Sequence, residues 1–284
     1  MGGAARWALN AGSAAVRKLE TRMEARGSLL CVGLDPELTR IPQVFRSGPH
    51  PLFQFCREII DATSPFVCAF KPNTAFFEAH GAQGWSELAM VFAYLREQHP
   101  EVFTICDAKR GDIGSTNRGY VSAIFDDLGA DAITLHPYLG AEALAPFLER
   151  ADRASIVLCR TSNPGAGELQ DLLIEGKPLW EHVAARVNRD WNALGNCMLV
   201  VGATWPEEMQ RIRAIAPEMT FLVPGIGAQG GDIEATVHAG LRSDGKGLAI
   251  SSSRAILYAE DPATAARATR DAINAAREHV YAGR

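Results

Sequence analysis

The feature that most constrains this chain is a series of eight short apolar segments, each of which ends in polar residues, glycine or proline. They are rich in β-branched residues, and their hydrophobicity is nearly continuous. Such segments are typical of strands buried on both faces of a parallel sheet. The eight segments are Ser28–Asp35, Phe66–Asn73, Val102–Lys109, Ala132–Tyr138, Ser155–Asn163, Cys197–Thr204, Thr220–Gly227 and Gly247–Ser253.

Most of the intervals between these segments have apolar residues at helical spacing, such as Leu88, Val91 and Leu95. Residues Ser13–Arg26 predict an additional helix before the first strand. Eight strand–helix units without a linker predict a (β/α)8 TIM barrel with an extra N-terminal helix, forming a single domain over residues 1–284. A doubly wound parallel sheet has similar contents and is the alternative.

The composition excludes several classes of partner. The chain has 284 residues and a net charge of -5, which argues against a basic nucleic-acid surface or a polybasic membrane patch. We find no transmembrane segment and no secretory signal pattern. The six cysteines have no Cys-x-x-Cys spacing, and the five that lie in or at the start of apolar segments are interpreted as buried free thiols. We therefore expect a cytoplasmic protein with no nucleic-acid or membrane partner.

Charged residues gather where predicted strands end, the position of functional residues in such barrels. The densest group is Asp107-Ala-Lys-Arg-Gly-Asp112. In an extended strand, Asp107 and Lys109 project to the same face, and Lys71 ends a neighbouring strand. This array can keep an ammonium protonated and direct it at a carbon where negative charge develops. A structural network of ion pairs at the barrel mouth is the alternative.

A glycine-rich segment, Pro224–Asp232, contains the spacing G-x-G-x-x-G. A dinucleotide site requires an acidic residue about 20 positions later, where this chain has an apolar segment and serines. After the seventh strand of a barrel, the same glycines expose backbone N–H groups suited to a phosphate. Arg254, after the eighth strand, can donate to that phosphate. A tight turn beside a surface arginine is the alternative.

The histidines do not predict a metal site. The seven histidines include no H-x-x-x-H or H-E-x-x-H motif. His136 ends a predicted strand and could line the site, but we interpret it as a core histidine with its hydrogen bonds satisfied.

Taken together, these motifs resemble orotidine 5′-phosphate decarboxylase, specifically the longer bacterial branch of that family. The resemblance extends over nearly all of the barrel and implies conversion of orotidine 5′-phosphate to UMP and CO2, without a cofactor or metal. The motifs that carry it are Val32–Asp35, Phe70–Asn73, Asp107–Asp112, Thr161–Gly165, Pro224–Asp232 and Ser253-Arg254.

The resemblance also implies roles for individual residues. Asp107 would lie against the substrate carboxylate, and Lys109 would stabilise and protonate the C6 carbanion. Asp112, from the second subunit of a homodimer, would complete the charged array with Lys71. The implied substrate-binding residues are Asp35, Lys71 and the second subunit's Thr116 for the ribose, Ser162 for the pyrimidine, and Gln229 and Arg254 for the phosphate.

The resemblance assigns no role to Asn73 or to contacts from the loops after the first and fifth strands. Two other functions stay open. One is a related barrel enzyme that uses Mg2+ to stabilise an enediolate of a sugar phosphate. The other is a non-catalytic phosphate-ligand binding protein, which would leave Asp107 and Lys109 unexplained.

Overall fold

Eight parallel strands of the computed structural model, which describes residues 12–226 and 232–282, form a closed barrel in the order β1-β10-β9-β8-β5-β4-β3-β2. The closed sheet confirms the predicted TIM barrel, and the doubly wound alternative is wrong because β1 pairs with both β2 and β10. The barrel strands are β1 (Leu30–Leu34), β2 (Ala69–Pro72), β3 (Phe103–Arg110), β4 (Ala132–Leu135), β5 (Ala154–Arg160), β8 (Cys197–Val201), β9 (Phe221–Val223) and β10 (Leu248–Ser252).

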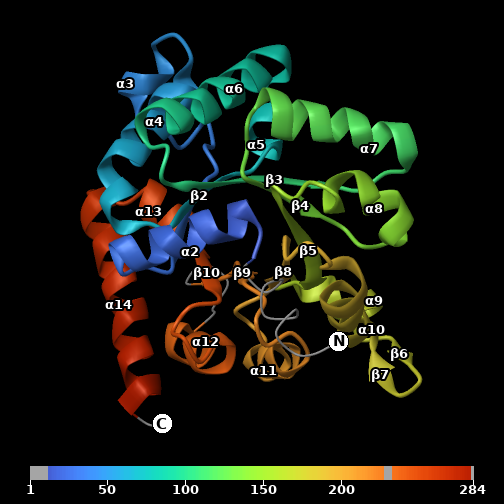
Figure 1. The fold of residues 1–284 in the computed structure, drawn as a ribbon. Helices are drawn as coiled ribbons and strands as arrows, with labels where there is room; N and C mark the ends of the chain where they lie inside the picture. Colours follow the sequence, from blue (N-terminus) through green and yellow to red (C-terminus); the bar gives the residue numbers. More distant parts are fainter. Residues whose placement is uncertain (1–11, 227–231, 283–284) are drawn as a thin grey trace.

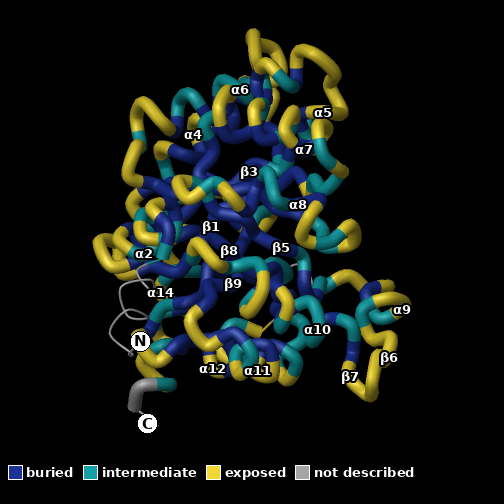
Figure 2. Tube along the Cα trace, turned by 45° about the vertical axis from the view of Figure 1, so that its right-hand side comes forward, coloured by how far each residue is buried: buried dark blue, intermediate teal, exposed yellow. Residues whose placement is uncertain are grey.

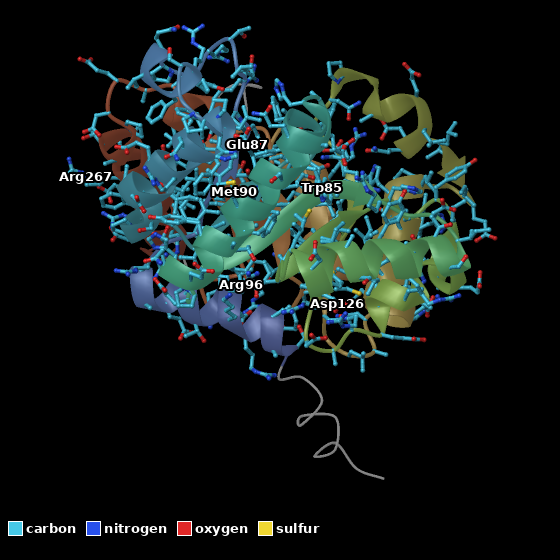
Figure 3. The ribbon with its side chains drawn as sticks, turned by 90° about the horizontal axis from the view of Figure 1, so that it is seen from above. Trp85, Glu87, Met90, Arg96, Asp126 and Arg267 are labelled. Atoms are coloured by element: carbon cyan, nitrogen blue, oxygen red, sulfur yellow. The ribbon has the colours of Figure 1, made fainter. Side chains whose placement is uncertain are left out.

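Helices surround the barrel, as Figure 1 shows. They pack on it through apolar faces and through a few buried polar contacts. Glu87, labelled in Figure 3, is 1% exposed and accepts a hydrogen bond from the Phe53 amide at 2.9 Å, which ties two of these helices together. The helices are α3 (Gln43–Arg46), α4 (Pro51–Thr63), α5 (Ala75–Glu78), α6 (Gly81–Gln98), α7 (Gly114–Val121), α8 (Gly140–Leu148), α10 (Leu179–Arg186), α11 (Pro206–Ile215), α12 (Ile233–Gly240), α13 (Arg254–Leu257) and α14 (Pro262–Ala282), with short 3-10 or π segments at η1 (Ser64–Phe66), η2 (Ser122–Asp127) and η4 (Val187–Trp191).

The predicted N-terminal helix is present as α2 (Ala14–Arg26). Ser13 caps its start by accepting a hydrogen bond from the Val16 amide, and Gly27 ends it in the left-handed region at φ 52°. A serine N-cap and a glycine after the last turn are the usual helix boundaries, so the local sequence determines both ends of α2.

Helix α2 lies across the amino-terminal ends of the strands. Arg22 is 3% exposed; it donates to the carbonyl of Val67, just before β2, and pairs with Glu101, just before β3, at 2.9 Å. Lys18 pairs with Asp131, just before β4, at 2.7 Å. The opposite end of the barrel, where the strands finish, is therefore the face available for a site.

The loop after β5 contains structure that the sequence did not predict. It includes η3 (Pro164–Ala166), α9 (Gly167–Gln170) and a two-stranded antiparallel hairpin of β6 (Leu173–Ile174) and β7 (Lys177–Pro178). Glu175 and Gly176 join the two strands, both at positive φ, which is the geometry of a type I′ turn. The hairpin projects from the body of the molecule and is mostly exposed (Figure 2).

The barrel strands form the centre of the buried core, which Figure 2 shows in dark blue. All five residues of β1 are buried, as expected for a strand covered on both faces. All six cysteines are free and buried, which confirms the interpretation of the five in apolar segments and extends it to the sixth. Burial raises the pKa of Cys31 to about 12. Within the described residues, no helix combines the length and apolar character needed to cross a bilayer.

Candidate active site

Three charged residues meet at the carboxyl-terminal ends of β2 and β3. The ammonium of Lys71 donates to Asp107 Oδ2 at 2.8 Å, and that of Lys109 donates to Asp107 Oδ1 at 2.7 Å. Each oxygen of the carboxylate therefore holds one ammonium. The structure thus brings together the three residues that the charged motif and the end of the second strand predicted to lie at one centre.

These three residues differ in exposure. Lys71 is 6% exposed and Asp107 is 7% exposed, whereas the side chain of Lys109 is 49% exposed. Burial alone would raise the pKa of Asp107, but the charges of Lys71 and Lys109 outweigh it and hold that pKa well below its usual range. Burial would likewise lower the pKa of Lys71, but Asp107 and Asp35 outweigh it and raise that pKa. The buried pair is thus fully charged near neutral pH, and Lys109 presents its ammonium to the mouth of the barrel.

The backbone near Lys109 departs from the expected extended strand. Lys109 has φ 46°, in the left-handed region, and the pairing of β3 with β4 shifts register between Cys106 and Arg110. The side chains of Asp107 and Lys109 do lie together, as expected, but the expected reason, an extended strand, is wrong. They meet because the strand bulges. A lysine in the left-handed region carries strain of about 1–3 kcal/mol, the kind found at functional sites.

Thr134 of β4 connects the two halves of this motif. Its hydroxyl donates to Asp107 Oδ1 at 2.8 Å and accepts a hydrogen bond from the Lys109 amide at 3.0 Å. Sequence reasoning missed Thr134, because a threonine within an apolar strand segment looks like an ordinary β-branched residue.

Asp35, directly after β1, lies beside the charged group. Ser253 donates to Asp35 Oδ2 at 2.7 Å, while Asp35 Oδ1 is inaccessible to solvent and has no hydrogen-bond partner among the described residues. A Cβ atom at Gly33 would lie 2.9 Å from Ser253 Cβ, so only glycine permits this approach. The influence of Asp35 on the pKa of Lys71 places both residues in one electrostatic cluster.

The structure gives Asn73 a local role. Its Oδ1 accepts a hydrogen bond from the Ala75 amide at 3.1 Å, at the start of α5, and its backbone forms a bridge with Asp107. The Thr74 amide also donates to the Asp107 carbonyl at 3.3 Å. Asn73 thus shapes the turn that fixes the end of β2 against β3.

His136 is not the core histidine that we expected. It is half-buried after β4, and its Nδ1 has no hydrogen-bond partner among the described residues. Its ring packs against Gly111, where a Cβ atom would lie 2.8 Å from Nε2. The expectation failed because β4 ends at Leu135, which places His136 in the following loop.

Asp112 and Thr116 lie in the loop and helix after β3. Asp112 Oδ1 accepts a hydrogen bond from the Ile113 amide at 2.7 Å, and the Asp112 amide donates to Asn117 Oδ1 at 2.9 Å. Thr116 is exposed on α7. Among the described residues, the ammonium of Lys109 is paired with Asp107 and not with Asp112.

The remaining predicted residues come from the other half of the barrel. Ser162 follows β5 and packs on Gly202, where a Cβ atom would lie 2.8 Å from the Ser162 backbone nitrogen. Arg254 is exposed at the start of α13, directly after Ser253. Gln229 lies outside the described residues. Within the described ranges, no group of three or more His, Cys, Asp and Glu side chains could hold a metal ion.

Comparisons with known proteins agree with the predicted resemblance. Residues 28–269 match the model of the orotidine 5′-phosphate decarboxylase / HUMPS family. The orotidine 5′-phosphate decarboxylase of Azoarcus sp. (strain BH72) is 53% identical over 266 residues, which cover 91% of this chain and 98% of that protein. The protein of the same name from Janthinobacterium sp. (strain Marseille) is 49% identical over 91% of this chain and 97% of its own length.

Solved structures give the same result. The OMP decarboxylase of Leishmania donovani superposes with a TM-score of 0.84 and is 41% identical, covering 93% of this chain and 99% of that chain. The UMP synthase of the same organism has a TM-score of 0.84 and 43% identity, covering 92% of this chain and 56% of that longer chain. With the charged cluster at the ends of β2 and β3, these matches show that the chain belongs to the orotidine 5′-phosphate decarboxylase / HUMPS family.

Proposed function

We propose that the chain is a carboxy-lyase that converts orotidine 5′-phosphate to UMP and CO2, the last step of de novo pyrimidine synthesis. The observation that carries the proposal is the Lys109 ammonium, half-exposed at the barrel mouth and held at 2.7 Å by an Asp107 carboxylate that Lys71 also neutralises. The proposal is also supported by relatives named orotidine 5′-phosphate decarboxylase, which are about half identical to this chain over nearly their full length.

The reaction needs a positive charge beside the carbon on which negative charge develops. When the bond between C6 and the carboxylate breaks, its electron pair stays on C6 in an orbital that cannot delocalise into the ring. The protein must therefore stabilise the carbanion electrostatically. In the proposal, the Lys109 ammonium lies beside C6 and gives it a proton, and the resulting amine recovers a proton from water. No cofactor is required for these steps.

Asp107 contributes to this step in two ways. Because its pKa is low, it stays anionic and keeps Lys109 oriented by a charge-assisted hydrogen bond. In the proposal it also lies against the substrate carboxylate, and the repulsion is relieved as CO2 leaves. Lys71 offsets the cost of burying Asp107.

The other candidate residues bind the parts of the substrate that do not react. Binding energy from the phosphate and ribose can position C6 against Lys109 and exclude water before the chemistry. Their proposed contacts are Asp35 and Lys71 with the ribose, Ser162 with the pyrimidine, and Gln229 and Arg254 with the phosphate.

We further propose that the active form is a cytoplasmic homodimer of single-domain subunits, in which Asp112 and Thr116 reach the partner's site. Two observations support this arrangement. Lys109 pairs within its own chain with Asp107, and among the described residues the Asp112 carboxylate accepts a hydrogen bond from the Ile113 amide but forms no ion pair, so it can pair with a cation of a second chain. Ile113, the residue after Asp112, is 60% exposed, and Tyr138, in the loop after β4, is 79% exposed. Exposed apolar residues next to a polar functional group are typical of protein interfaces.

The proposed activity can be tested by following the ultraviolet absorbance of orotidine 5′-phosphate with the purified protein in excess chelator. Loss of substrate absorbance that matches UMP formation is the expected result. Activity that disappears with chelator and returns with Mg2+ would favour the sugar-phosphate type of barrel enzyme. Binding of UMP without any turnover of orotidine 5′-phosphate would favour a binding protein.

A further inference from the structure

Arg160, the last residue of β5, is a fully buried cation that the proposed chemistry does not use. It is 1% exposed. Its guanidinium carbon lies 4.1 Å above the centre of the Trp205 ring, its Nη2 donates to Asp171 Oδ2 at 3.3 Å, and the same nitrogen lies 3.7 Å from Glu208 Oε1. Burying a charge is costly unless it is paired, so an arginine at this position requires an explanation.

These contacts join three segments that meet beside the candidate site. Asp171 follows α9 in the long loop after β5, and Glu208 is in the first turn of α11. Trp205 directly precedes α11, and its indole N–H donates to the carbonyl of Thr161 at 2.9 Å. Arg160 therefore contacts both Asp171 of the loop and the indole ring of Trp205. The indole in turn donates to Thr161, the first residue of the loop.

Thr161 is fixed from several directions. Its amide donates to Gln170 Oε1 at 2.9 Å, and the Gln170 amide group donates back to its hydroxyl at 2.8 Å. The next residue, Ser162, packs against Gly202, whose own amide donates to the Arg160 carbonyl at 2.7 Å. The position of Ser162 is thus set by a network of contacts that includes Arg160 and Trp205.

We propose that Arg160 is a positioning residue for the pyrimidine: stacked on Trp205, it fixes the backbone of Thr161 and Ser162 so that Ser162 can contact the base. The inference rests on the proposed function, in which Ser162 binds the pyrimidine. Arginine suits this role because its planar group stacks on an aromatic ring and pairs with carboxylates at the same time.

The test compares two ligands that differ by the base. UMP contains the pyrimidine, whereas ribose 5-phosphate keeps the sugar and phosphate alone. In Arg160→Met, we expect the Kd of UMP to rise by about tenfold, because a displaced hydrogen-bonding group loses its contact. The Kd of ribose 5-phosphate should stay within about twofold of wild type. Both constants are measured by calorimetry. The readout is the ratio of the Kd of UMP to the Kd of ribose 5-phosphate, which should rise in Arg160→Met.

Two further variants locate the effect. Trp205→Phe keeps a ring beneath the guanidinium but removes the N–H that donates to Thr161, so it should raise the same ratio. Arg160→Lys keeps a cation for the two carboxylates and is expected to lie between wild type and Arg160→Met. If Arg160→Met does not fold, these two variants carry the test.

The matched control is Arg22→Met, which removes another buried arginine, at the opposite end of the barrel. It should lower the thermal stability and leave the ratio of the two dissociation constants unchanged. Equal weakening of UMP and ribose 5-phosphate by Arg160→Met, or an unchanged ratio in Trp205→Phe, would overturn the positioning role. Wild-type protein that binds neither ligand would instead overturn the proposed function, a result distinct from a changed ratio.

Discussion

The Lys109 amide donates to the hydroxyl of Thr134 at 3.0 Å, and the same hydroxyl donates to Asp107 at 2.8 Å. One neutral side chain on β4 thus holds both the backbone of the proposed proton donor and the carboxylate that orients it. Because Thr134 is 1% exposed, water cannot replace these hydrogen bonds if the hydroxyl is removed.

Replacing Thr134 with valine should therefore impair the chemistry more than substrate binding. The side chain keeps its shape but loses both hydrogen bonds, so we expect kcat to fall by about tenfold with little change in KM. Steady-state decarboxylation assays give both constants. Thr134→Ser, which keeps the hydroxyl, is the control and should retain most of kcat. An equal loss in the serine variant would instead indicate that the methyl group matters through packing.

Lys109→Ala should remove most of kcat while leaving UMP binding intact. The ammonium is proposed both to stabilise and to protonate the carbanion, so its loss affects the transition state. Turnover and UMP affinity are measured separately. A loss of only a few-fold in kcat, with KM carrying the effect, would assign Lys109 to binding.

Arg254→Ala should act through the phosphate. We expect the affinity for UMP to fall far more than the affinity for uridine, because a guanidinium supplies charge-assisted hydrogen bonds to phosphate oxygens. Calorimetry with both ligands provides the measurement. Equal weakening of uridine and UMP would mean that Arg254 does not contact the phosphate.

Mixed dimers test whether Asp112 is shared between subunits. Lys109→Ala and Asp112→Ala proteins, each nearly inactive, are unfolded, mixed and refolded together. In a mixed dimer with shared sites, one site has both defects and the other has neither, so random pairing should restore about a quarter of wild-type activity. Mixed dimers that form and remain inactive would show that Asp112 serves its own chain.

The charged cluster also predicts a dependence of stability on acid. The pKa of Asp107 is lower in the folded protein than in the unfolded chain, so its contribution to the free energy of unfolding is present above about pH 4 and is lost as the pH falls further. Between pH 4 and pH 2, wild type should lose stability more steeply than Asp107→Asn, by up to about 1.4 kcal/mol per pH unit. Urea unfolding across this range measures both slopes, and parallel slopes would contradict the prediction.

The barrel could be predicted from the sequence because strands buried on both faces have continuous apolar character, as in β1 and β8. The hairpin of β6 and β7 could not, because strands of two residues are too short to show a period. The turn at Glu175-Gly176 was its one local signal.

The candidate site was predictable to the extent that it depends on charged residues at strand ends. Lys71, Asp107 and Lys109 are recognisable because charges rarely end buried strands. The left-handed backbone at Lys109 has no signature in the residue type, because it is imposed by the pairing of β3 with β4. Arg160 also escaped notice, since its partners Trp205 and Glu208 are distant in sequence.

Helix α2 cross-links the strands at one end of the barrel and not at the other. Besides its contacts before β2, β3 and β4, it reaches the segment before β10, where Glu20 pairs with Arg242 at 2.8 Å. The helix is therefore a brace across the ring of strands at the end away from the site. Because these contacts oppose movement of the strands at that end, we expect any rearrangement on substrate binding to occur in the loops of the opposite rim. Closing such a site reshapes loops without deforming the barrel that aligns the reacting groups.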